Sequence, residues 1–373
     1  MVIPSLGRIG GAERQMMLLA QGMHRRGWRV TVVELAGPGN QLAADLAAQR
    51  IALLSLEMRK GLADPRGWLR FHHWLRREQP DVVHAHLHHA AFLARWSRLS
   101  APVRVLVDTL HSSSTGTLGR HIGYRISNWL PNRVSAVSHA VAEAYLIAGM
   151  VTSPKAVELP NGIDTSEWKP DAQVRTRVRC ELSLESEFLW FAAGRLDPVK
   201  DYPTLLQALA GLPEAARLAI AGKGPMEGEL RRLSAELGLE HRVRFLGFQP
   251  DVRPWMQAAD GFVLSSRLEG LPIALLEAAA CELPAVATCV PGTREAIVDG
   301  QTGFFATAGS VQFLQEAMAR MMSMPVEGRR ALGQNARQLV QERFSLDAVL
   351  DRWESLYTDL LHRNIRPVRY GKT

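Results

Sequence analysis

The chain has 373 residues, more than one hydrophobic core usually supports, so its length predicts two domains. Apolar residues make up 47% and charged residues 22%, as in globular proteins, and three cysteines without metal-type spacing argue against a disulfide scaffold and predict a cytoplasmic protein. The net charge of +7 comes from the first half, because residues 1–170 hold 20 Lys and Arg against 12 Asp and Glu.

Short β-rich runs alternate with helical patterns in both halves, at a spacing of about 20 to 30 residues that predicts βαβ units and parallel sheets. The expected strands are 29–35, 81–85, 103–109 and 133–137 in the first half, and 189–194, 217–222, 243–248, 262–266, 285–290 and 303–307 in the second. A turn-rich join over 158–170 separates the halves, and 171–187 is a helical lead-in. The last helix is expected over 345–362, with an apolar stripe of Leu346, Val349, Leu350, Trp353, Leu356, Tyr357 and Leu360.

A glycine-rich turn, 7–13, follows the apolar run 2–6 and opens a helical pattern. Its Gly10 and Gly11 let backbone N–H groups approach an anion or a sugar at a helix N-terminus. An ordinary tight turn has the same pattern, and the motif is not the GxGxxG fingerprint of dinucleotide-binding proteins.

Several polar or glycine positions follow expected strands of the second half, at the sheet edge where open α/β folds bind ligands. Arg195 and Lys200 are two fixed cations that suit a diphosphate. Gly222 is expected to line the same site and Phe248 to lie near a nucleobase. Solvated surface cations and a tight turn are the alternatives.

The strongest pattern is 269–277, directly after an expected strand. Pro272 has the backbone angle favoured in a first helical turn, where N–H groups can face a phosphate. On one continuous helix Glu269 and Glu277 would be about 12 Å apart, too far to act on one bond as the carboxylate pair of a retaining hydrolase does. Separate roles are therefore expected, with Glu269 at a sugar and Glu277 at a ribose.

Four clustered histidines, His84, His86, His88 and His89, suggest a metal site, because imidazoles are common ligands and alternate residues of a strand share a face. Polar side chains at a strand end beside a ligand explain the cluster equally well. We expect no metal.

Two basic, aromatic stretches, 68–77 and 120–133, lie in the positively charged half. In the first, Trp68, Leu69, His72 and Leu75 recur at helical spacing, as in helices that lie on membrane surfaces. A helix packed on the core has the same spacing. Together with the charge asymmetry, the pattern favours an anionic membrane surface as a partner, and no nucleic acid is expected.

In their order and spacing, these motifs resemble glycosyltransferase family 4 over essentially the whole chain. The residues that carry the resemblance are Gly10-Gly11-Ala12-Glu13, Arg195 with Lys200, Glu269 with Glu277, and the segments 81–86, 109–111, 135–138 and 160–164. Family members usually have a few more residues before the glycine loop, so whether Met1 is the natural start stays open.

The resemblance implies an α/β protein with the GT-B fold: two Rossmann-like, doubly wound parallel-sheet domains that face a central cleft. Residues 1–165 would bind the acceptor, with 345–373 crossing back to pack on them, and 166–344 would bind the donor. The implied enzyme is a retaining, metal-independent hexosyltransferase without a cofactor. It would move a sugar from a UDP-sugar or GDP-sugar to a glycan or lipid-linked acceptor, in capsule, O-antigen or exopolysaccharide assembly on the cytoplasmic face of the inner membrane.

The resemblance also implies residue roles. The catalytic residues would be His111, Glu269, Arg195 and Lys200. The donor would contact Gly11, Arg195, Lys200, Gly222, Phe248, Gly270, Leu271, Pro272, Ile273 and Glu277. The acceptor would contact Gly10, Gly11, His84, His86 and His111.

Two other functions fit the same motifs. One is a nonenzymatic GT-B protein that binds a nucleotide sugar without turning it over, and the other is a GT-B enzyme such as a sugar-nucleotide epimerase or a phosphorylase. The intact charged residues argue against the first. Product analysis with a labelled donor separates the second, because an epimerase needs no acceptor and a phosphorylase needs phosphate.

Overall fold

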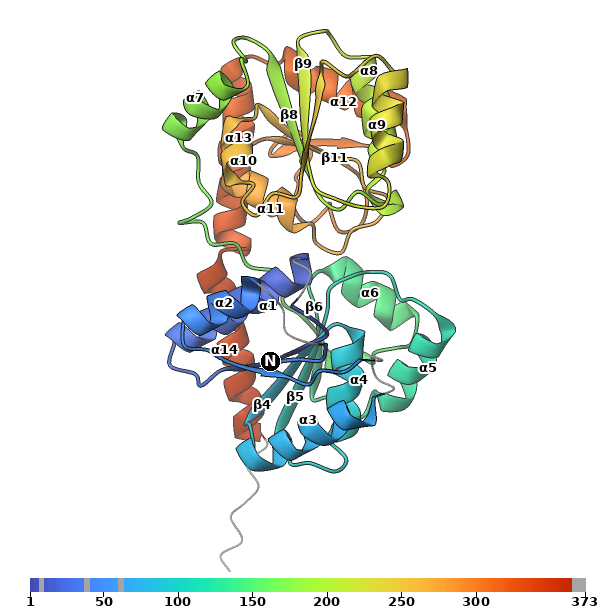
Figure 1. Cartoon of the computed structure of the whole chain (residues 1–373), viewed down its shortest axis with the longest axis vertical. Helices are drawn as coiled ribbons and strands as arrows, with labels where there is room; N and C mark the ends of the chain where they lie inside the picture. The colour runs from blue at the N-terminus through green and yellow to red at the C-terminus, as the bar shows by residue number, and fades with distance from the viewer. Residues whose placement is uncertain (7–9, 37–40, 60–63, 364–373) are drawn as a thin grey trace, which may run out of the picture. The chain divides into compact units, whose positions relative to one another are not determined.

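The computed structural model describes residues 1–6, 10–36, 41–59 and 64–363 (Figure 1). The chain forms two compact units. Unit 1 consists of Met1–Gly162 and the chain from Leu346 onward, and unit 2 consists of Ile163–Ser345.

Unit 1 is built on a parallel sheet. Its strands, in the described residues, are β1 (Val2–Ile3), β2 (Thr31–Glu34), β3 (Ala52–Ser55), β4 (Val82–His86), β5 (Val105–Leu110), β6 (Arg133–Ala136) and β7 (Ala156–Glu158), in the order β3-β2-β1-β4-β5-β6-β7. The helices are α1 (Gly11–Arg25), α2 (Gln41–Ala48), α3 (Pro65–Glu78), α4 (His88–Ser97), α5 (Leu118–Ser127), α6 (His139–Ile147) and α14 (Leu346–Arg363), with a 3-10 turn η2 (Ser153–Lys155).

Unit 2 has a second parallel sheet, in the order β10-β9-β8-β11-β12-β13. Its strands are β8 (Phe188–Ala193), β9 (Ala216–Ala221), β10 (Val243–Gly247), β11 (Gly261–Leu264), β12 (Ala285–Thr288) and β13 (Gly303–Ala306). The helical segments are α7 (Ala172–Glu181), η3 (Pro198–Lys200), α8 (Tyr202–Ala210), α9 (Glu227–Glu236), α10 (Arg253–Ala258), α11 (Ile273–Ala280), α12 (Val311–Ser323) and α13 (Val326–Arg343).

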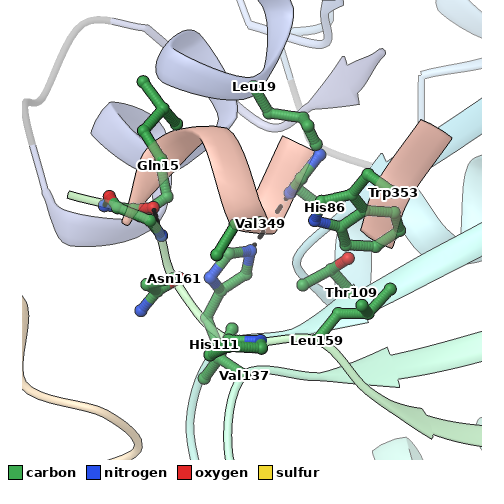
Figure 2. Close-up of a pocket in the computed structure, with 13 residues that line it drawn as sticks. Gln15, Leu19, His86, Thr109, His111, Val137, Leu159, Asn161, Val349 and Trp353 are labelled. Carbon is green, nitrogen blue, oxygen red and sulfur yellow. Dashed lines mark hydrogen bonds between the residues drawn. The ribbon is translucent and has the colours of Figure 1, made fainter. Parts of the chain in front are cut away.

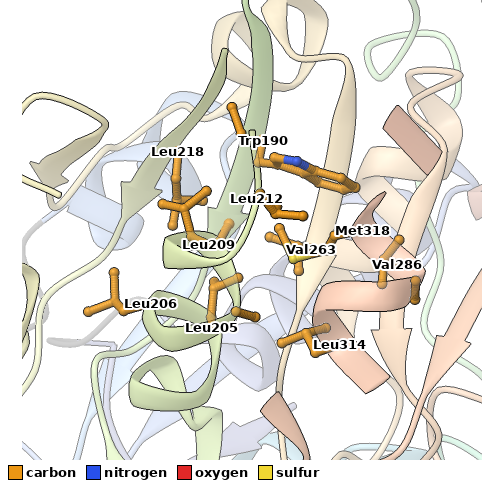
Figure 3. Packing of buried hydrophobic residues seen from close by; sticks show 14 of the residues in the cluster. Trp190, Leu205, Leu206, Leu209, Leu212, Leu218, Val263, Val286, Leu314 and Met318 are labelled. Atoms are coloured by element: carbon orange, nitrogen blue, oxygen red, sulfur yellow. The ribbon is translucent and has the colours of Figure 1, made fainter. Parts of the chain in front are cut away.

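The central strands β8 and β11 of unit 2 are apolar along their whole length because helices cover both faces of the sheet. Every residue of β8 and of β11 is buried. One face packs on α8 and α12, where Trp190 and Val263 of the sheet meet Leu205 and Leu314 of the helices (Figure 3). This two-sided burial explains why the second half lacks the alternating pattern of a half-exposed strand.

Each sheet has its first strand beside its fourth, which places a topological switch point between β1 and β4 in unit 1 and between β8 and β11 in unit 2. The connections on the two sides of a switch point leave in opposite directions, because βαβ crossovers are right-handed. Open α/β sheets bind their ligands at such a point, outside the carboxyl ends of the strands.

The helix α14 packs on unit 1, as predicted. Its residues Leu346, Val349 and Trp353 share a buried cluster with Leu19 of α1 and Val107 of β5. The apolar stripe of the last helix thus completes the first unit, although the whole of unit 2 lies between them in the sequence.

The structure differs from the sequence-based predictions at three places. The edge strands β3 and β7 were not predicted, because their short, partly exposed sequences carry a weak strand pattern. In α3, Leu69 was expected on the apolar stripe but is 60% exposed, and Gly67, Phe71 and Leu75 form the buried face. The face is rotated because Gly67 lies against Met58, so closely that a Cβ there would collide with the Met58 side chain.

A buried ion pair joins α4, β5 and α5 within unit 1. The Arg95 Nε donates to Asp108 Oδ2 at 2.6 Å, and its Nη1 donates to Ser127 Oγ at 2.9 Å. The guanidinium also lies 4.5 Å from the centre of the Tyr124 ring. Both charged side chains are 0% exposed, so each depends on the other for compensation of its lost hydration.

We expect Arg95→Ala to lower the free energy of unfolding of unit 1 by about 3–5 kcal/mol, because it leaves Asp108 buried without its counter-charge. Urea unfolding followed by circular dichroism measures the change. The matched control is Arg104→Ala, which removes the exposed pair with Asp81 and should cost less than about 1 kcal/mol. Equal costs for the two variants would contradict the role given to the buried pair.

Candidate active site

In unit 1, side chains from three neighbouring strands form a continuous hydrogen-bonded chain near the carboxyl edge of the sheet. His84 of β4 pairs through Nδ1 with Tyr357 Oη of α14 and through Nε2 with Thr109 Oγ1 of β5, each at 2.6 Å. The Thr109 hydroxyl then pairs with Ser135 Oγ of β6, also at 2.6 Å. The Trp353 ring lies 4.5 Å from the His84 ring. Both nitrogens of His84 are occupied, so it cannot contact a ligand directly.

His86 connects this chain to His111. Its ring lies 4.1 Å from the His84 ring, and its Nδ1 is 3.1 Å from His111 Nε2 (Figure 2). His86 is 2% exposed, and its Nε2 has no hydrogen-bond partner among the described residues. Both rings line a cavity of about 20 Å³, which is the size of one water molecule, together with Asn161 and Val349. His111 is the most accessible of the three histidines, because His84 and His86 are buried behind it.

The three imidazoles are uncharged near neutral pH. Burial lowers the pKa of His84 and of His86 well below the usual value, and repulsion from the other imidazoles, if protonated, and from the N-terminal amino group lowers it further. Burial also lowers the pKa of His111 to about 4. A neutral imidazole has one donor and one acceptor nitrogen, and Nε2 of His111 already contacts His86, so its Nδ1 can donate to or accept from a hydroxyl group according to the tautomer.

The helix α1 brings the predicted glycine turn to the same unit. Gly10 and Gly11 lie exposed at its N-terminus, whereas residues 7–9 of the predicted loop lie outside the described residues. One turn further on, the Gln15 side chain donates to the Gly162 carbonyl at 3.0 Å and accepts from the Gly162 N–H at 2.9 Å. These two hydrogen bonds tie α1 to Gly162, the last residue of the first segment of unit 1.

In unit 2, an ion pair spans the switch point of the sheet. Lys200 follows β8, Glu269 follows β11, and Lys200 Nζ lies 2.6 Å from Glu269 Oε1. The two loops are also joined through the main chain, because Ser265 Oγ donates to the Lys200 carbonyl at 2.8 Å and the Arg267 N–H donates to Val199 at the same distance. The Glu269 side chain is 9% exposed and that of Lys200 is 22% exposed, so the pair lies at the edge of solvent.

Two further cations flank this pair. Arg195 is 70% exposed, and its guanidinium is 2.6 Å from Asp197. Arg267 is 61% exposed and lies 2.9 Å from Asp201. Sequence reasoning identified Arg195 but missed Arg267, Asp197 and Asp201, because short-range charge pairs around a turn have no distinctive spacing.

Gly222 is required by the backbone packing of the neighbouring loops. Its φ is +152°, and a Cβ there would lie 1.9 Å from the Gly194 carbonyl oxygen. Gly292, in the loop after β12, likewise approaches the Gly270 carbonyl so closely that a Cβ would lie 2.3 Å from it. The glycines therefore let the strand-end loops of unit 2 pack directly against one another.

The segment 269–277 adopts the predicted loop and helix, with one difference. Helix α11 begins at Ile273, and Pro272 is the residue before it, so the proline caps the helix and does not form its first turn. Gly270, Leu271 and Pro272 are buried, and Glu277 lies inside α11 and is 5% exposed. Phe248 follows β10 and is 47% exposed.

The histidine cluster is divided between different contacts. His88 and His89 begin α4, with ring centres 3.9 Å apart, and burial lowers the pKa of His88 to about 4. Their rings are separate from the chain formed by His84 and His86. Among the described residues, no group of three or more His, Cys, Asp or Glu side chains is arranged to hold a metal ion.

Sequence reasoning missed Tyr357 and Trp353 as site residues. Both were assigned only to the apolar stripe of the last helix, and both are buried as that stripe requires. The tyrosine hydroxyl and the face of the tryptophan ring nevertheless reach His84. A polar atom on an otherwise apolar stripe was the available signal, because a buried tyrosine hydroxyl needs a partner.

Both halves of the chain match known families. Residues 9–167 match the family described as "Glycosyltransferase Family 4", and residues 176–339 match the family described as "Glycosyl transferases group 1". No described helix is long and apolar enough to cross a membrane.

The chain is 28% identical to the N-acetyl-alpha-D-glucosaminyl L-malate synthase of Bacillus anthracis, over 77% of this chain and 76% of that one. It is 23% identical to the UDP-Gal:alpha-D-GlcNAc-diphosphoundecaprenol alpha-1,3-galactosyltransferase of Escherichia coli, over 80% and 81% of the two chains. Its structure is similar to that of Anabaena Alr3699/HepE in complex with UDP-glucose, with a TM-score of 0.86, 23% identity, and coverage of 96% and 98%. The two parallel-sheet units and this likeness show the GT-B fold.

The buried histidines make the stability of unit 1 depend on pH. Because the pKa of His84 and of His86 is lower in the folded protein than in the unfolded chain, the unfolded chain binds protons first as the pH falls. The contribution of the two residues to stability is full well above about pH 6.5, the usual pKa of an unfolded histidine, and is lost progressively as the pH falls below that value.

Hydrogen exchange measured by mass spectrometry, corrected for the intrinsic rate, tests this expectation on the amides of β4 and β5. The amides of β8 and β9 are an internal control, since the sequence places only His241 in unit 2 and that residue is exposed. Protection that falls equally in both units, or in neither, would contradict the assignment.

Proposed function

The chain belongs to glycosyltransferase family 4, and from this we propose that it is a retaining, metal-independent hexosyltransferase. It moves a sugar from a nucleoside diphosphate sugar to a hydroxyl group of a glycan or lipid-linked acceptor, in the assembly of a bacterial surface polysaccharide. Unit 2 binds the donor and unit 1 binds the acceptor. Two other functions, a nonenzymatic sugar-nucleotide-binding protein and an epimerase, lack a supporting observation of their own.

The observation that carries the proposal is the ion pair of Lys200 with Glu269 at the switch point of unit 2. Open α/β sheets bind nucleotides at this place, outside the carboxyl ends of the strands. A lysine there can neutralise a diphosphate as a point charge, and a carboxylate can accept hydrogen bonds from sugar hydroxyl groups. One pair of side chains thus offers complementary partners for the two ends of a sugar diphosphate.

Donor binding rearranges the charges of this pair. In the free protein Lys200 is held by Glu269, so a diphosphate has to share or displace that contact. Arg195 has an exposed guanidinium and can provide a second cation. As the bond between the sugar and the diphosphate breaks, negative charge grows on the leaving oxygen, and both cations stabilise it. They take the place that a divalent metal has in other transferases, which is why we propose a metal-independent reaction.

The geometry of transfer follows from retention of configuration. The acceptor hydroxyl approaches the face of the sugar from which the nucleotide leaves, its oxygen bonds to the anomeric carbon, and its proton passes to the departing phosphate oxygen. The anomeric carbon carries positive charge during this step. His111 is neutral, with its pKa lowered to about 4, so it can hold the sugar or the acceptor by hydrogen bonds without adding a repulsive charge.

Known proteins suggest the substrate classes. The similar Anabaena structure holds UDP-glucose, and the name of the similar Escherichia coli protein gives a UDP-galactose donor and a diphosphoundecaprenol-linked acceptor. We therefore propose a uridine diphosphate sugar before a guanosine diphosphate sugar. Phe248, which is exposed after β10, is the proposed contact for the base.

Lys200→Ala and Glu269→Gln should each reduce kcat at least about a hundredfold, because each removes a charge that acts on the transition state. Release of the nucleoside diphosphate with the acceptor present measures turnover. Lys169→Ala and Glu236→Gln are matched controls on the exposed surface of unit 2 and should leave turnover unchanged. If Lys200→Ala and Glu269→Gln fold and turn over like the wild type, the proposed roles are wrong.

The stereochemical proposal has a separate test. The proton NMR spectrum of the first-formed product should show the anomeric configuration of the donor sugar, and turnover should be the same with and without a metal chelator. An inverted product would refute retention. Activity that is lost with the chelator and restored by a divalent metal would refute metal independence.

A further inference from the structure

Helix α5 exposes a stripe of large apolar side chains. Leu118 is 76% exposed, Ile122 is 51% exposed and Ile126 is 55% exposed. Residues four apart lie on one face of a helix, so the three side chains form one row. Trp129, just beyond the helix, continues the row and is 65% exposed. The opposite face of α5 is the packed one, because its Tyr124 and Ser127 are buried.

Neighbouring elements extend this apolar surface. Leu99, two residues after α4, is 56% exposed and lines a hollow of about 430 Å³ together with Trp129. On the other side, Arg125 of α5 donates to the Ala148 carbonyl at 2.9 Å, next to Ile147, which is 80% exposed. We call Leu99, Leu118, Ile122, Ile126, Trp129 and Ile147 the α5 patch.

The surface around the α5 patch has an unusual charge. Between Asp81 and Glu143 the sequence contains a single acidic residue, Asp108, which is 0% exposed and paired with the buried Arg95. The other charged residues of this segment are all cations, Arg98, Arg104, Arg120, Arg125 and Arg133. Among the described residues Arg104 forms an exposed ion pair with Asp81, whereas Arg98, Arg120, Arg125 and Arg133 form none, so the surface around α5 is positive on balance.

We propose that the α5 patch docks unit 1 on an anionic lipid bilayer. The leucine and isoleucine side chains enter the boundary between headgroups and acyl chains, as the apolar face of an interfacial helix does. Trp129 lies at the level of the headgroups, where an indole meets both an apolar and a polar environment. Arg125, which is exposed on α5 itself, binds lipid phosphates. The proposal does not rest on the reaction proposed for the site.

Charge complementarity favours a bilayer over a second copy of the chain. A symmetric dimer through this face would place each cationic surface against its own copy, and like charges that face each other oppose binding. An anionic bilayer instead neutralises the same arginines. A bilayer also has no fixed shape, so the row of apolar side chains can enter it without a complementary pocket.

Only one of the two stretches that suggested a membrane surface carries such a patch. In the stretch 68–77 the structure turns Phe71 and Leu75 inward, and Leu69 is its one large apolar side chain with more than half of its surface exposed. In the stretch 120–133, Ile122, Ile126 and Trp129 all face solvent. The docking surface is therefore assigned to α5 and not to α3.

Sedimentation of the full-length protein with lipid vesicles tests the proposal. Vesicles of equal parts phosphatidylglycerol and phosphatidylcholine should bind the protein, with an affinity that falls as salt is added, and pure phosphatidylcholine vesicles should bind it at least about tenfold more weakly. Ile122→Ser with Ile126→Ser should lower binding to the anionic vesicles at least about tenfold. The matched control is Phe313→Ser with Val326→Ser, two exposed apolar residues of unit 2, which should bind like the wild type.

Circular dichroism melting of both double variants establishes that they fold. No binding to anionic vesicles at low salt, or equal loss of binding in both double variants, overturns the proposal. So does sedimentation equilibrium that shows a dimer abolished by the α5 substitutions, since the patch would then be an interface between copies. A loss of vesicle binding confined to the α5 variant, in a protein that is monomeric by the same measurement, supports it.

Discussion

In both units the candidate residues lie where the first strand of a parallel sheet runs beside the fourth. Right-handed crossovers send the chain to opposite faces of the sheet on the two sides of this junction, so β8 and β11 end side by side before their chains part. Lys200 and Glu269 sit on these two loops and bridge them. In unit 1, Gly11 follows β1 and His86 ends β4, across the equivalent junction. The strand order thus positions groups that are far apart in the sequence.

The candidate site residues of the two units differ in charge. In unit 1, His84 and His86 are uncharged, and His84 is hydrogen-bonded to hydroxyl groups. In unit 2, Lys200 and Glu269 place opposite charges close together at the edge of solvent. Neutral donors and acceptors suit hydroxyl groups, and fixed charges suit phosphates. This difference is consistent with the proposed division between acceptor and donor.

The sequence was informative where burial on both faces or turn chemistry dictated the structure. The central strands and the loop that contains Glu269 follow from apolar runs and from glycine and proline at their ends. The edge strands β3 and β7 could not be predicted, because few residues and partial exposure leave little pattern. The bond from Tyr357 to His84 was out of reach for another reason, since it joins residues 273 positions apart and only the packing of α14 on unit 1 brings them together.

Unit 1 is discontinuous in the sequence, whereas unit 2 is one uninterrupted segment, Ile163–Ser345. During synthesis on the ribosome, unit 2 can therefore complete its fold before the residues of α14 have been translated. His84 acquires its partners Tyr357 and Trp353 only from that last helix. Unit 1 is thus assembled last, and a nascent chain that stops early contains a finished second unit and an incomplete first one.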